Sequence, residues 1–305
     1  MYPNHHQVKY GSLDRCQVCN SDKLHLVLDL GHQPLCDSLL TKEMLNESEN
    51  TYPLRMCWCE ECSLAQLDYC VDGSLIYHPD YPYRTGITKE LVEYQNDVCL
   101  SLISKYNLKH DDFVVDLGSN DGTLLGGFNK HGISVLGVEP TNIAKIANQN
   151  GIVTVQKFFD VNVANEIKNK HGQASLILAT NMFAHMATMG EVISGIEILL
   201  KDDGMFVFEN HYLLDVIEGG QFDTIYHEHL RTYSLKSLLK LFSYYNFTIT
   251  DVQRGDRYGG NIRVHVTKGK NKPVSENVTR LLELEEISGL HKLETYEKFA
   301  ERVKK

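Results

Sequence analysis

The sequence contains no apolar run that approaches the roughly 20 residues a helix needs to span a lipid bilayer. Its first ten residues, MYPNHHQVKY, lack the charged-then-apolar order of a secretory signal peptide. Basic residues are fewer than acidic ones, so the formal net charge is −10 and the pI about 5.8. We therefore expect a cytoplasmic protein with no membrane partner. Nucleic acid is a poor partner because phosphate binding needs clustered lysine and arginine.

The chain is long enough for two domains, or for one large domain with additions, since it has 305 residues. With 42% hydrophobic and 23% charged residues it can bury a normal core. It has no internal repeat, and a monomer is compatible with the sequence. In a cytosolic chain, eight cysteines favour metal ligands and buried thiols over disulfides.

Two Cys-x-x-Cys pairs, at residues 16–19 and 59–62, stand out among the six cysteines that precede residue 63. Each pair lets two thiolates reach one ion from a tight turn, and two pairs complete a closed tetrahedral zinc site without an open coordination position. We predict a structural Zn²⁺ that lets a small domain fold. Cys36 and Cys57 lack ligand spacing, so we expect small buried apolar side chains there. The predicted ligands are Cys16, Cys19, Cys59 and Cys62.

Alternating apolar segments predict an α/β fold with a mostly parallel, doubly wound sheet that binds ligands at the carboxyl ends of its strands. Strands are expected at 113–117, 134–138, 152–155, 175–180 and 204–209, and helices at 123–131, 142–149, 161–170 and 189–200. A Pro- and Tyr-rich connector, residues 77–86, precedes this region and leads into apolar residues at helical spacing over 88–106.

Further elements are expected beyond the alternating region. Ser234 should cap a helix, two strands are predicted at 247–253 and 261–267, and the charged segment from Ser275 should be helical with a break near Gly289. These patterns suggest three domains. They are a zinc-binding domain over 1–75, a cofactor-binding domain over 76–268 and a helical segment over 269–305.

The stretch VVDLGSNDGTLL, residues 114–125, combines a short buried strand, a glycine-rich turn and the start of a helix. Gly118 and Gly122 let the backbone turn sharply and approach a ligand. Asp116 brings a carboxylate where a dinucleotide fold needs bare amides for pyrophosphate, so the turn suits a ligand with an amino group and a ribose. Glu139, after the next strand, can accept hydrogen bonds from both ribose hydroxyls. The pattern resembles the S-adenosylmethionine site of class I methyltransferases; the alternative is a plain glycine-rich turn.

Two further positions belong to this predicted site. Phe158, next to Phe159, can stack on adenine, although such aromatics are equally common in cores. Asn181 ends the fourth predicted strand, where class I enzymes contact cofactor or substrate. The expected cofactor contacts are Asp116, Gly118, Asn120, Gly122, Glu139, Phe158 and Asn181.

Four ionisable side chains, Tyr226, His227, Glu228 and His229, crowd one tetrapeptide just before the helix capped by Ser234. If the segment is extended, Tyr226 and Glu228 share one face and the two histidines share the other. A solvated surface turn and a His-x-His metal site are the alternatives. Acid–base catalysis is favoured, because the unperturbed pKa of histidine lies near neutrality.

The order of motifs resembles one family. The two cysteine pairs, DYPY, DLGSNDG, NMFAHM (residues 181–186), FDTIYHEH and RYGGNIRV are similar to sugar C-methyltransferases that act on nucleotide-linked 4-keto sugars. The resemblance implies S-adenosylmethionine as methyl donor and a nucleotide sugar, of the dTDP-linked kind, as substrate. It implies His229 as general base, assisted by Tyr226 and Glu228. It also implies that a tyrosine of the connector lines the site, either Tyr81 or the preferred Tyr83.

Members of this family continue into a further Rossmann-like domain that is implied to help hold the nucleotide sugar. The chain ends at Lys305, so we expect this domain to be missing and the binding of the nucleotide sugar to be affected. Two other functions remain open, an O- or N-methyltransferase and a cofactor-binding fragment without turnover. A zinc-ribbon nucleic-acid binder is disfavoured by the acidic balance.

Overall fold

The computed structural model describes residues 5–7 and 9–305; residues 1–4 and 8, part of the predicted domain 1–75, lie outside the described residues. The chain forms two compact units. The first unit contains the chain up to Ile76 with Phe183–Gly190 and Glu209–Lys305, and the second contains Tyr77–Met182 and Glu191–Phe208. The three domains expected from the sequence stay a prediction, because the two compact units divide the chain at other residues.

The second unit contains the predicted α/β alternation. Its parallel strands lie in the order β9-β6-β7-β8, and β10 lies beside β9. Each strand agrees with its predicted range within four residues at either end, and the largest difference is at the start of β10. The strands are β6 (Phe113–Leu117), β7 (Ser134–Val138), β8 (Thr154–Val155), β9 (Ala174–Thr180) and β10 (Leu200–His211).

The predicted helices also form. The helices of this region are α2 (Lys89–Tyr106), α3 (Thr123–Lys130), α4 (Ile143–Gln149), α5 (Val161–His171) and α6 (Met189–Leu199). Helix α5 begins at the cap Asp160, whose carboxylate accepts the Val163 N–H at 2.8 Å and so satisfies one of the amides that a helix start leaves unpaired.

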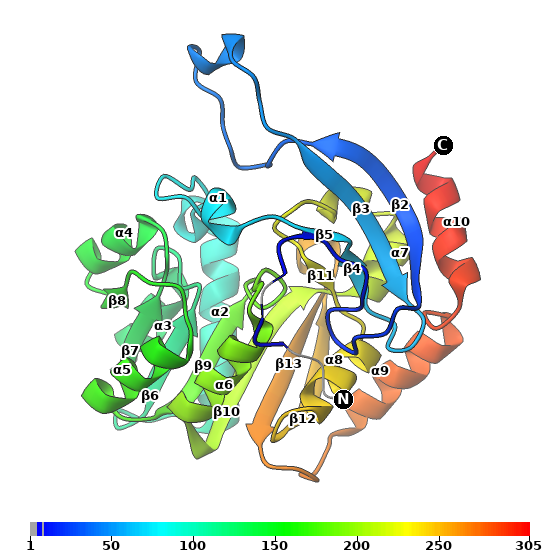
Figure 1. Ribbon diagram of the computed structural model, residues 1–305. Coiled ribbons are helices and arrows are strands. Elements are labelled where there is room, and N and C mark those ends of the chain that lie inside the picture. The colour runs from blue at the N-terminus through cyan, green and yellow to red at the C-terminus, as the bar shows by residue number, and fades with distance from the viewer. Residues whose placement is uncertain (1–4, 8) are drawn as a thin grey trace. The chain divides into compact units, whose positions relative to one another are not determined.

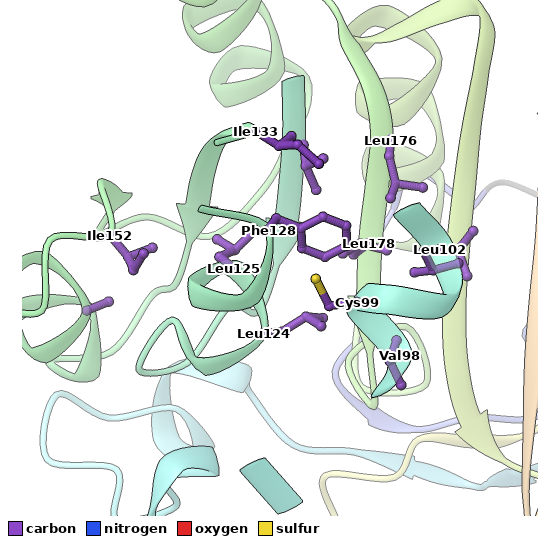
Figure 2. Close-up of a cluster of buried hydrophobic side chains, with 13 residues drawn as sticks. Val98, Cys99, Leu102, Leu124, Leu125, Phe128, Ile133, Ile152, Leu176 and Leu178 are labelled. Carbon is purple, nitrogen blue, oxygen red and sulfur yellow. The ribbon is translucent and has the colours of Figure 1, made fainter. Parts of the chain in front are cut away.

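A buried apolar cluster holds this unit together, with Phe128 of α3 at its centre (Figure 2). Leu176 and Leu178 of β9 face it, and Cys99 of α2 packs beside it. Gly127 allows this packing, because a Cβ there would lie 2.9 Å from the Cys99 sulfur. Helices α2 and α3 therefore approach each other closely.

The first unit is built on an antiparallel sheet in the order β11-β4-β3-β2. Figure 1 shows β2 and β3 as a long curved hairpin whose connection, residues 34–51, extends away from it. Trp58 of β3 stacks on Tyr296 of α10, with ring centroids 4.8 Å apart. The strands are β1 (Gly11–Ser12), which pairs with β5 (Tyr69–Cys70), and β2 (Leu24–Gln33), β3 (Tyr52–Cys59), β4 (Ala65–Leu67) and β11 (Arg231–Thr232).

The central sheet differs from the expected one in the C-terminal part of this unit. The antiparallel hairpin of β12 (Phe247–Gly255) and β13 (Asn261–Lys268) extends the sheet in the order β12-β13-β10, where the end of β10 belongs to the first unit. The central sheet is therefore mixed. The predicted helix cap is confirmed, since Ser234 accepts the Ser237 N–H at 3.0 Å. The predicted break near Gly289 is confirmed between α9 and α10.

The remaining helices complete the description. They are α1 (Gly73–Ile76), α7 (Leu213–Gly219), α8 (Leu235–Ser243), α9 (Glu276–Ile287) and α10 (Leu293–Val303), with 3-10 turns η1 (Met44–Asn46), η2 (Thr85–Ile87), η3 (Phe222–Thr224) and η4 (Arg257–Gly259). Within the described part of the chain, none of the helices combines the length and the apolar character of a bilayer-spanning segment.

Candidate active site and metal centre

The glycine-rich loop after β6 has the conformation that its sequence predicts. Gly118, Asn120 and Gly122 all have positive φ, at 70°, 51° and 79°. A Cβ on Gly118 would lie 2.8 Å from the Met182 side chain, so only glycine fits both the backbone and the space. The Gly118 N–H donates to the Val138 carbonyl at 2.8 Å, which fixes the loop to the end of β7.

Three polar side-chain atoms beside this loop are buried and have no hydrogen-bond partner among the described residues. They are Asp116 Oδ1, Ser119 Oγ and Asn181 Oδ1. Asp116 lies on β6 and Asn181 directly follows the neighbouring β9, in the left-handed conformation. Buried polar atoms are rarely unpaired, and these oxygens can accept the N–H groups of a ligand ammonium. The residues present therefore fit the amino acid part of S-adenosylmethionine.

Glu139 is buried at the end of β7 and its carboxylate is already oriented. It accepts the Asn120 N–H at 3.1 Å on Oε2, and the Thr141 N–H and hydroxyl at 3.0 and 2.7 Å on Oε1. A carboxylate has about four lone-pair positions, so Oε2 retains one for a ligand hydroxyl. This arrangement suits the predicted contact with a ribose.

The connector is fastened to the same loop through Asn120 and Asp121. Asn120 accepts the Thr85 N–H at 2.8 Å and donates to the Tyr83 carbonyl at 2.9 Å. Asp121 accepts the Gly86 N–H at 2.8 Å. These bonds position Tyr83, which is 45% exposed, beside the glycine-rich loop. The sequence did not predict this link, since it gives no sign that the two segments pair.

The two phenylalanines after β8 have different environments. Phe159 is buried against Gly195, whose Cβ would lie 2.9 Å from its ring, so Phe159 belongs to the core. Phe158 is 48% exposed, which leaves its ring accessible for stacking. Of the pair, Phe158 stays the candidate for the adenine contact.

The pKa of Asp116 is raised to about 8 by burial and, to a smaller extent, by the charge of Glu139. A neutral carboxyl avoids the cost of an isolated buried charge. A cationic ligand beside Asp116 would reverse this preference and favour the carboxylate.

The four predicted zinc ligands lie together in the first unit. Their sulfur atoms all lie within 4.8 Å of one another. The Cys16 and Cys62 sulfurs are 3.5 Å apart, as are those of Cys19 and Cys59. Tetrahedral Zn–S bonds of about 2.3 Å place sulfurs roughly 3.8 Å apart, so the four thiols fit one Zn²⁺ with a small expansion.

The two cysteine pairs have the same local geometry. The residues that follow them, Asn20 and Ser63, have φ of 61° and 58°. Their N–H groups donate to the Cys16 and Cys59 carbonyls, both at 2.9 Å. Each turn is thus shaped by its own backbone hydrogen bond.

Mutual hydrogen bonds between the thiols raise the pKa of Cys16 and Cys62 and lower that of Cys19. Without a cation, therefore, only some of the four crowded thiols can ionise. Zinc binding releases the remaining protons, since thiolates are the ligands.

The motif of residues 226–229 is a turn and not an extended strand. The His229 N–H donates to the Tyr226 carbonyl at 2.9 Å. The turn brings Tyr226 to His229, with ring centroids 4.0 Å apart, and directs His227 to the Pro53 carbonyl at 3.3 Å. The alternation of faces was expected only for an extended segment, and residues 226–229 instead form a four-residue turn.

His229 is buried and held in one tautomer. Its Nδ1 contacts the Thr224 carbonyl at 2.7 Å, and since a carbonyl only accepts, Nδ1 carries the proton. The lone pair of Nε2 then accepts the Tyr226 hydroxyl at 2.9 Å. Burial lowers the pKa of His229 well below its ordinary value, and the nearby His185 and His211 lower it further. The ring is therefore a neutral base at pH 7.

The rings of His185 and His211 each lie 4.9 Å from that of His229. Sequence analysis gave His211 no role, although its place at the end of β10 could have indicated one. The start of the helix after the motif binds a carboxylate from a distant part of the chain. Its Leu235 and Lys236 N–H groups donate to the buried Glu285.

Glu228 is buried and accepts the Cys36 thiol at 3.6 Å. Cys36 is exposed, so the expectation of a buried apolar thiol was wrong for it, whereas Cys57 is buried. The reason is its place in the irregular connection between β2 and β3.

Comparison with known proteins agrees with this geometry. Residues 16–77 match the model of a "zinc binding domain", residues 91–252 that of a "methyltransferase domain" and residues 256–305 that of a "C-methyltransferase C-terminal domain". C-methyltransferase NovU of Streptomyces niveus is 32% identical over 290 residues, which are 94% of this chain and 69% of NovU. The chain belongs to the family of S-adenosylmethionine-dependent C-methyltransferases with a zinc-binding N-terminal domain.

The match over residues 256–305 bears on the C-terminal domain that sequence analysis expected to be missing. The chain does carry sequence of that domain, so its absence is not confirmed.

Among solved structures, an S-adenosylmethionine-dependent methyltransferase from Clostridium acetobutylicum covers 58% of this chain and 92% of its own, with 13% identity and a TM-score of 0.46. Magnesium protoporphyrin IX methyltransferase from Synechocystis covers 58% of this chain and 83% of its own, with 13% identity and a TM-score of 0.46.

Replacing Cys59 by serine should remove the metal and unfold the region around β3, because a structural zinc site contributes folding energy directly. We expect about one zinc per chain in wild type and a loss in Cys59→Ser, measured by elemental analysis alongside thermal denaturation. Cys57→Ala, two residues away on the same strand, should keep its zinc. Metal-free protein with the thermal profile of wild type would contradict the prediction.

Stability should depend on the protonation of Asp116. Between pH of about 4 and 8, folded Asp116 is protonated while the same group in the unfolded chain is ionised. The folded state then binds more protons, so the free energy of unfolding should fall as pH rises through this window. The free energy of unfolding is to be measured with urea at pH 6 and at pH 9. In Asp116→Asn the difference between the two values should be smaller than in wild type by more than about 1 kcal/mol. The exposed Asp203→Asn is the control, and an unchanged pH slope in Asp116→Asn would refute the assignment.

Glu139→Ala should weaken S-adenosylmethionine binding by about 1.5–3 kcal/mol, the range for hydrogen bonds to a charged group. Calorimetry measures this directly. Glu139→Gln should lose less, because its amide oxygen can still accept from Thr141. Glu166→Ala, which removes an exposed partner of Lys157, should leave affinity unchanged. Equal affinity in wild type and Glu139→Ala would exclude the ribose contact.

Proposed function

We propose that the protein methylates a ring carbon next to the ketone of a nucleotide-linked 4-keto deoxysugar, of the dTDP-linked kind. One observation carries the proposal. His229 is a buried neutral imidazole whose Nδ1–H is held by the Thr224 carbonyl and whose Nε2 lone pair contacts Tyr226. Such a base serves removal of a carbon-bound proton, a step that transfer to oxygen or nitrogen does not need. The relation to NovU supports transfer to carbon.

The ring proton beside a ketone is weakly acidic, so a base acts on it only if the oxygen that gains charge is stabilised. In our proposal Nε2 of His229 takes this proton and the ring becomes an imidazolium. The Thr224 carbonyl keeps the ring oriented throughout, because its contact is to the opposite nitrogen. The buried carboxylate of Glu228, the preceding residue, would stabilise the positive charge.

Tyr226 has a second role in this scheme. Its hydroxyl lies 2.9 Å from Nε2 of His229, the atom that must receive the substrate proton. Substrate entry would turn the hydroxyl to the ketone oxygen, where it donates a hydrogen bond to the enolate. S-adenosylmethionine, when bound, supplies an electrophilic methyl group on sulfur, and Asp116, Asn120, Glu139 and Asn181 would hold it. Tyr83 and Phe158 are proposed to contact substrate and adenine.

His229→Ala should reduce methyl transfer roughly 10²- to 10⁴-fold and leave cofactor affinity almost unchanged, because the base acts only in the proton-transfer step. The assay uses a 4-keto sugar nucleotide in deuterated water and follows exchange of the ring proton and methylation together. His227→Ala is the matched control, because this ring faces the Pro53 carbonyl. Near-normal exchange in His229→Ala would place the base elsewhere.

The position of the new methyl group tests the reaction class. Nuclear magnetic resonance of the product should show coupling of the methyl protons to ring carbons through a carbon–carbon bond. A methyl group on oxygen or nitrogen would instead support the alternative reaction. Binding of cofactor without any transfer would support a fragment without turnover.

A further inference from the structure

The turn proposed to hold the base is attached to the second cysteine pair. Directly after His229, Leu230 accepts the Leu67 N–H at 3.0 Å. Strand β11 then pairs antiparallel with β4, so that Arg231 lies opposite Gln66. Strand β4 begins three residues after Cys62. The backbone therefore connects the zinc centre to the residue next to the base.

Gln17, inside the first cysteine pair, reinforces this connection. Its N–H donates to the Gln66 side chain at 2.7 Å. Its amide nitrogen donates to the Leu230 carbonyl at 3.2 Å and to that of Leu67 at 3.4 Å. Its amide oxygen accepts Arg231 at 2.6 Å. One side chain between two zinc ligands thus contacts both strands that carry the turn.

Arg231 extends the connection to the other side of the base. Its guanidinium is 2% exposed and donates to Gln17, to the Tyr233 hydroxyl at 2.9 Å, and to the Met186 carbonyl. Met186 follows His185, whose ring lies 4.9 Å from that of His229. Arg231 therefore holds the segments of both histidines.

The charge of Arg231 also needs a partner. None of its hydrogen bonds within the described residues goes to a carboxylate, and a buried cation is costly without an opposite charge. Arg231 and Cys16 line one cavity of about 250 Å³. Four thiolates around Zn²⁺ would carry a net charge of about −2, and we infer that this site is the counter-charge of Arg231.

We propose that Gln17 and Arg231 are positioning residues through which the zinc centre holds the turn of residues 226–230 and keeps His229 buried. The inference rests on the proposed function only for the role of His229; the contacts stand without it. Zinc then has a purpose beyond folding the N-terminal domain. It fixes the geometry and the protonation of the proposed base.

Gln17→Met tests the link, since methionine keeps the volume and loses every side-chain hydrogen bond. We expect about one zinc per chain, unchanged cofactor affinity, and a kcat reduced roughly 10- to 100-fold, the scale of a small misplacement. Gln17→Glu keeps the acceptor for Arg231 and loses the donor to Leu230, so its kcat should be intermediate. Gln33→Met, which removes an exposed amide of the same unit, should behave as wild type.

Titration of the His229 ring by nuclear magnetic resonance separates positioning from simple loss of stability. His185, His211 and Tyr226 surround this ring, and burial is the main cause of its low pKa. Loosening the turn should admit water and raise that pKa toward 6.5, moving the acid limb of the kcat profile to higher pH.

Unchanged titration and kcat in both Gln17 variants, with zinc retained, would overturn the link and leave the proposed function intact. A shifted titration in a protein that methylates no 4-keto sugar nucleotide would support the link and refute the proposed function. If Gln17→Met fails to fold, Gln17→Glu decides: a wild-type titration in that variant refutes the role of the Leu230 contact.

Discussion

The cluster of four thiols is the constraint on which the first unit depends. It joins two turns that are distant in sequence, residues 16–19 and 59–62, and each turn is already shaped by its own backbone hydrogen bonds. Strand β3 enters the second turn and β4 leaves it toward β11. Zinc binding to isolated zinc fingers contributes about 10–16 kcal/mol, enough to hold such a small sheet in place. The proposed catalytic turn follows from this anchor through Leu67 and Leu230.

The second unit uses a different device, since its site is held by protein hydrogen bonds around unpaired oxygens. Asn120 makes hydrogen bonds to two parts of the site. Its N–H donates to Glu139, and its side chain bonds to the connector at Tyr83 and Thr85. Meanwhile Asp116 and Asn181 keep buried oxygens without partners. Native proteins tolerate that cost at functional sites, where a ligand supplies the partners. A site so built is complete only with its cofactor.

Much of the fold could be predicted because periodicity and capping are local. The alternating strands and helices over 113–200, the cap at Ser234 and the break near Gly289 all follow from nearby residues. The mixed sheet could not, because strand direction depends on how the β12–β13 hairpin pairs with distant strands. The conformation of residues 226–229 was left open, since a crowded polar tetrapeptide has no periodicity that separates a turn from a strand.

The sequence by itself determined the chemistry available: two Cys-x-x-Cys pairs, a glycine-rich loop with its acids, and a histidine in a polar motif. These are residue types at fixed spacing, and their local conformation depends mainly on φ preferences and short-range hydrogen bonds. Only the tertiary structure decided which groups meet. It set His185 and His211 around His229, gave Glu285 the helix start at Leu235, and joined Gln17 to Arg231. Burial and long-range contacts are properties of the packed chain, so the protonation of His229 and Asp116 follows from packing alone.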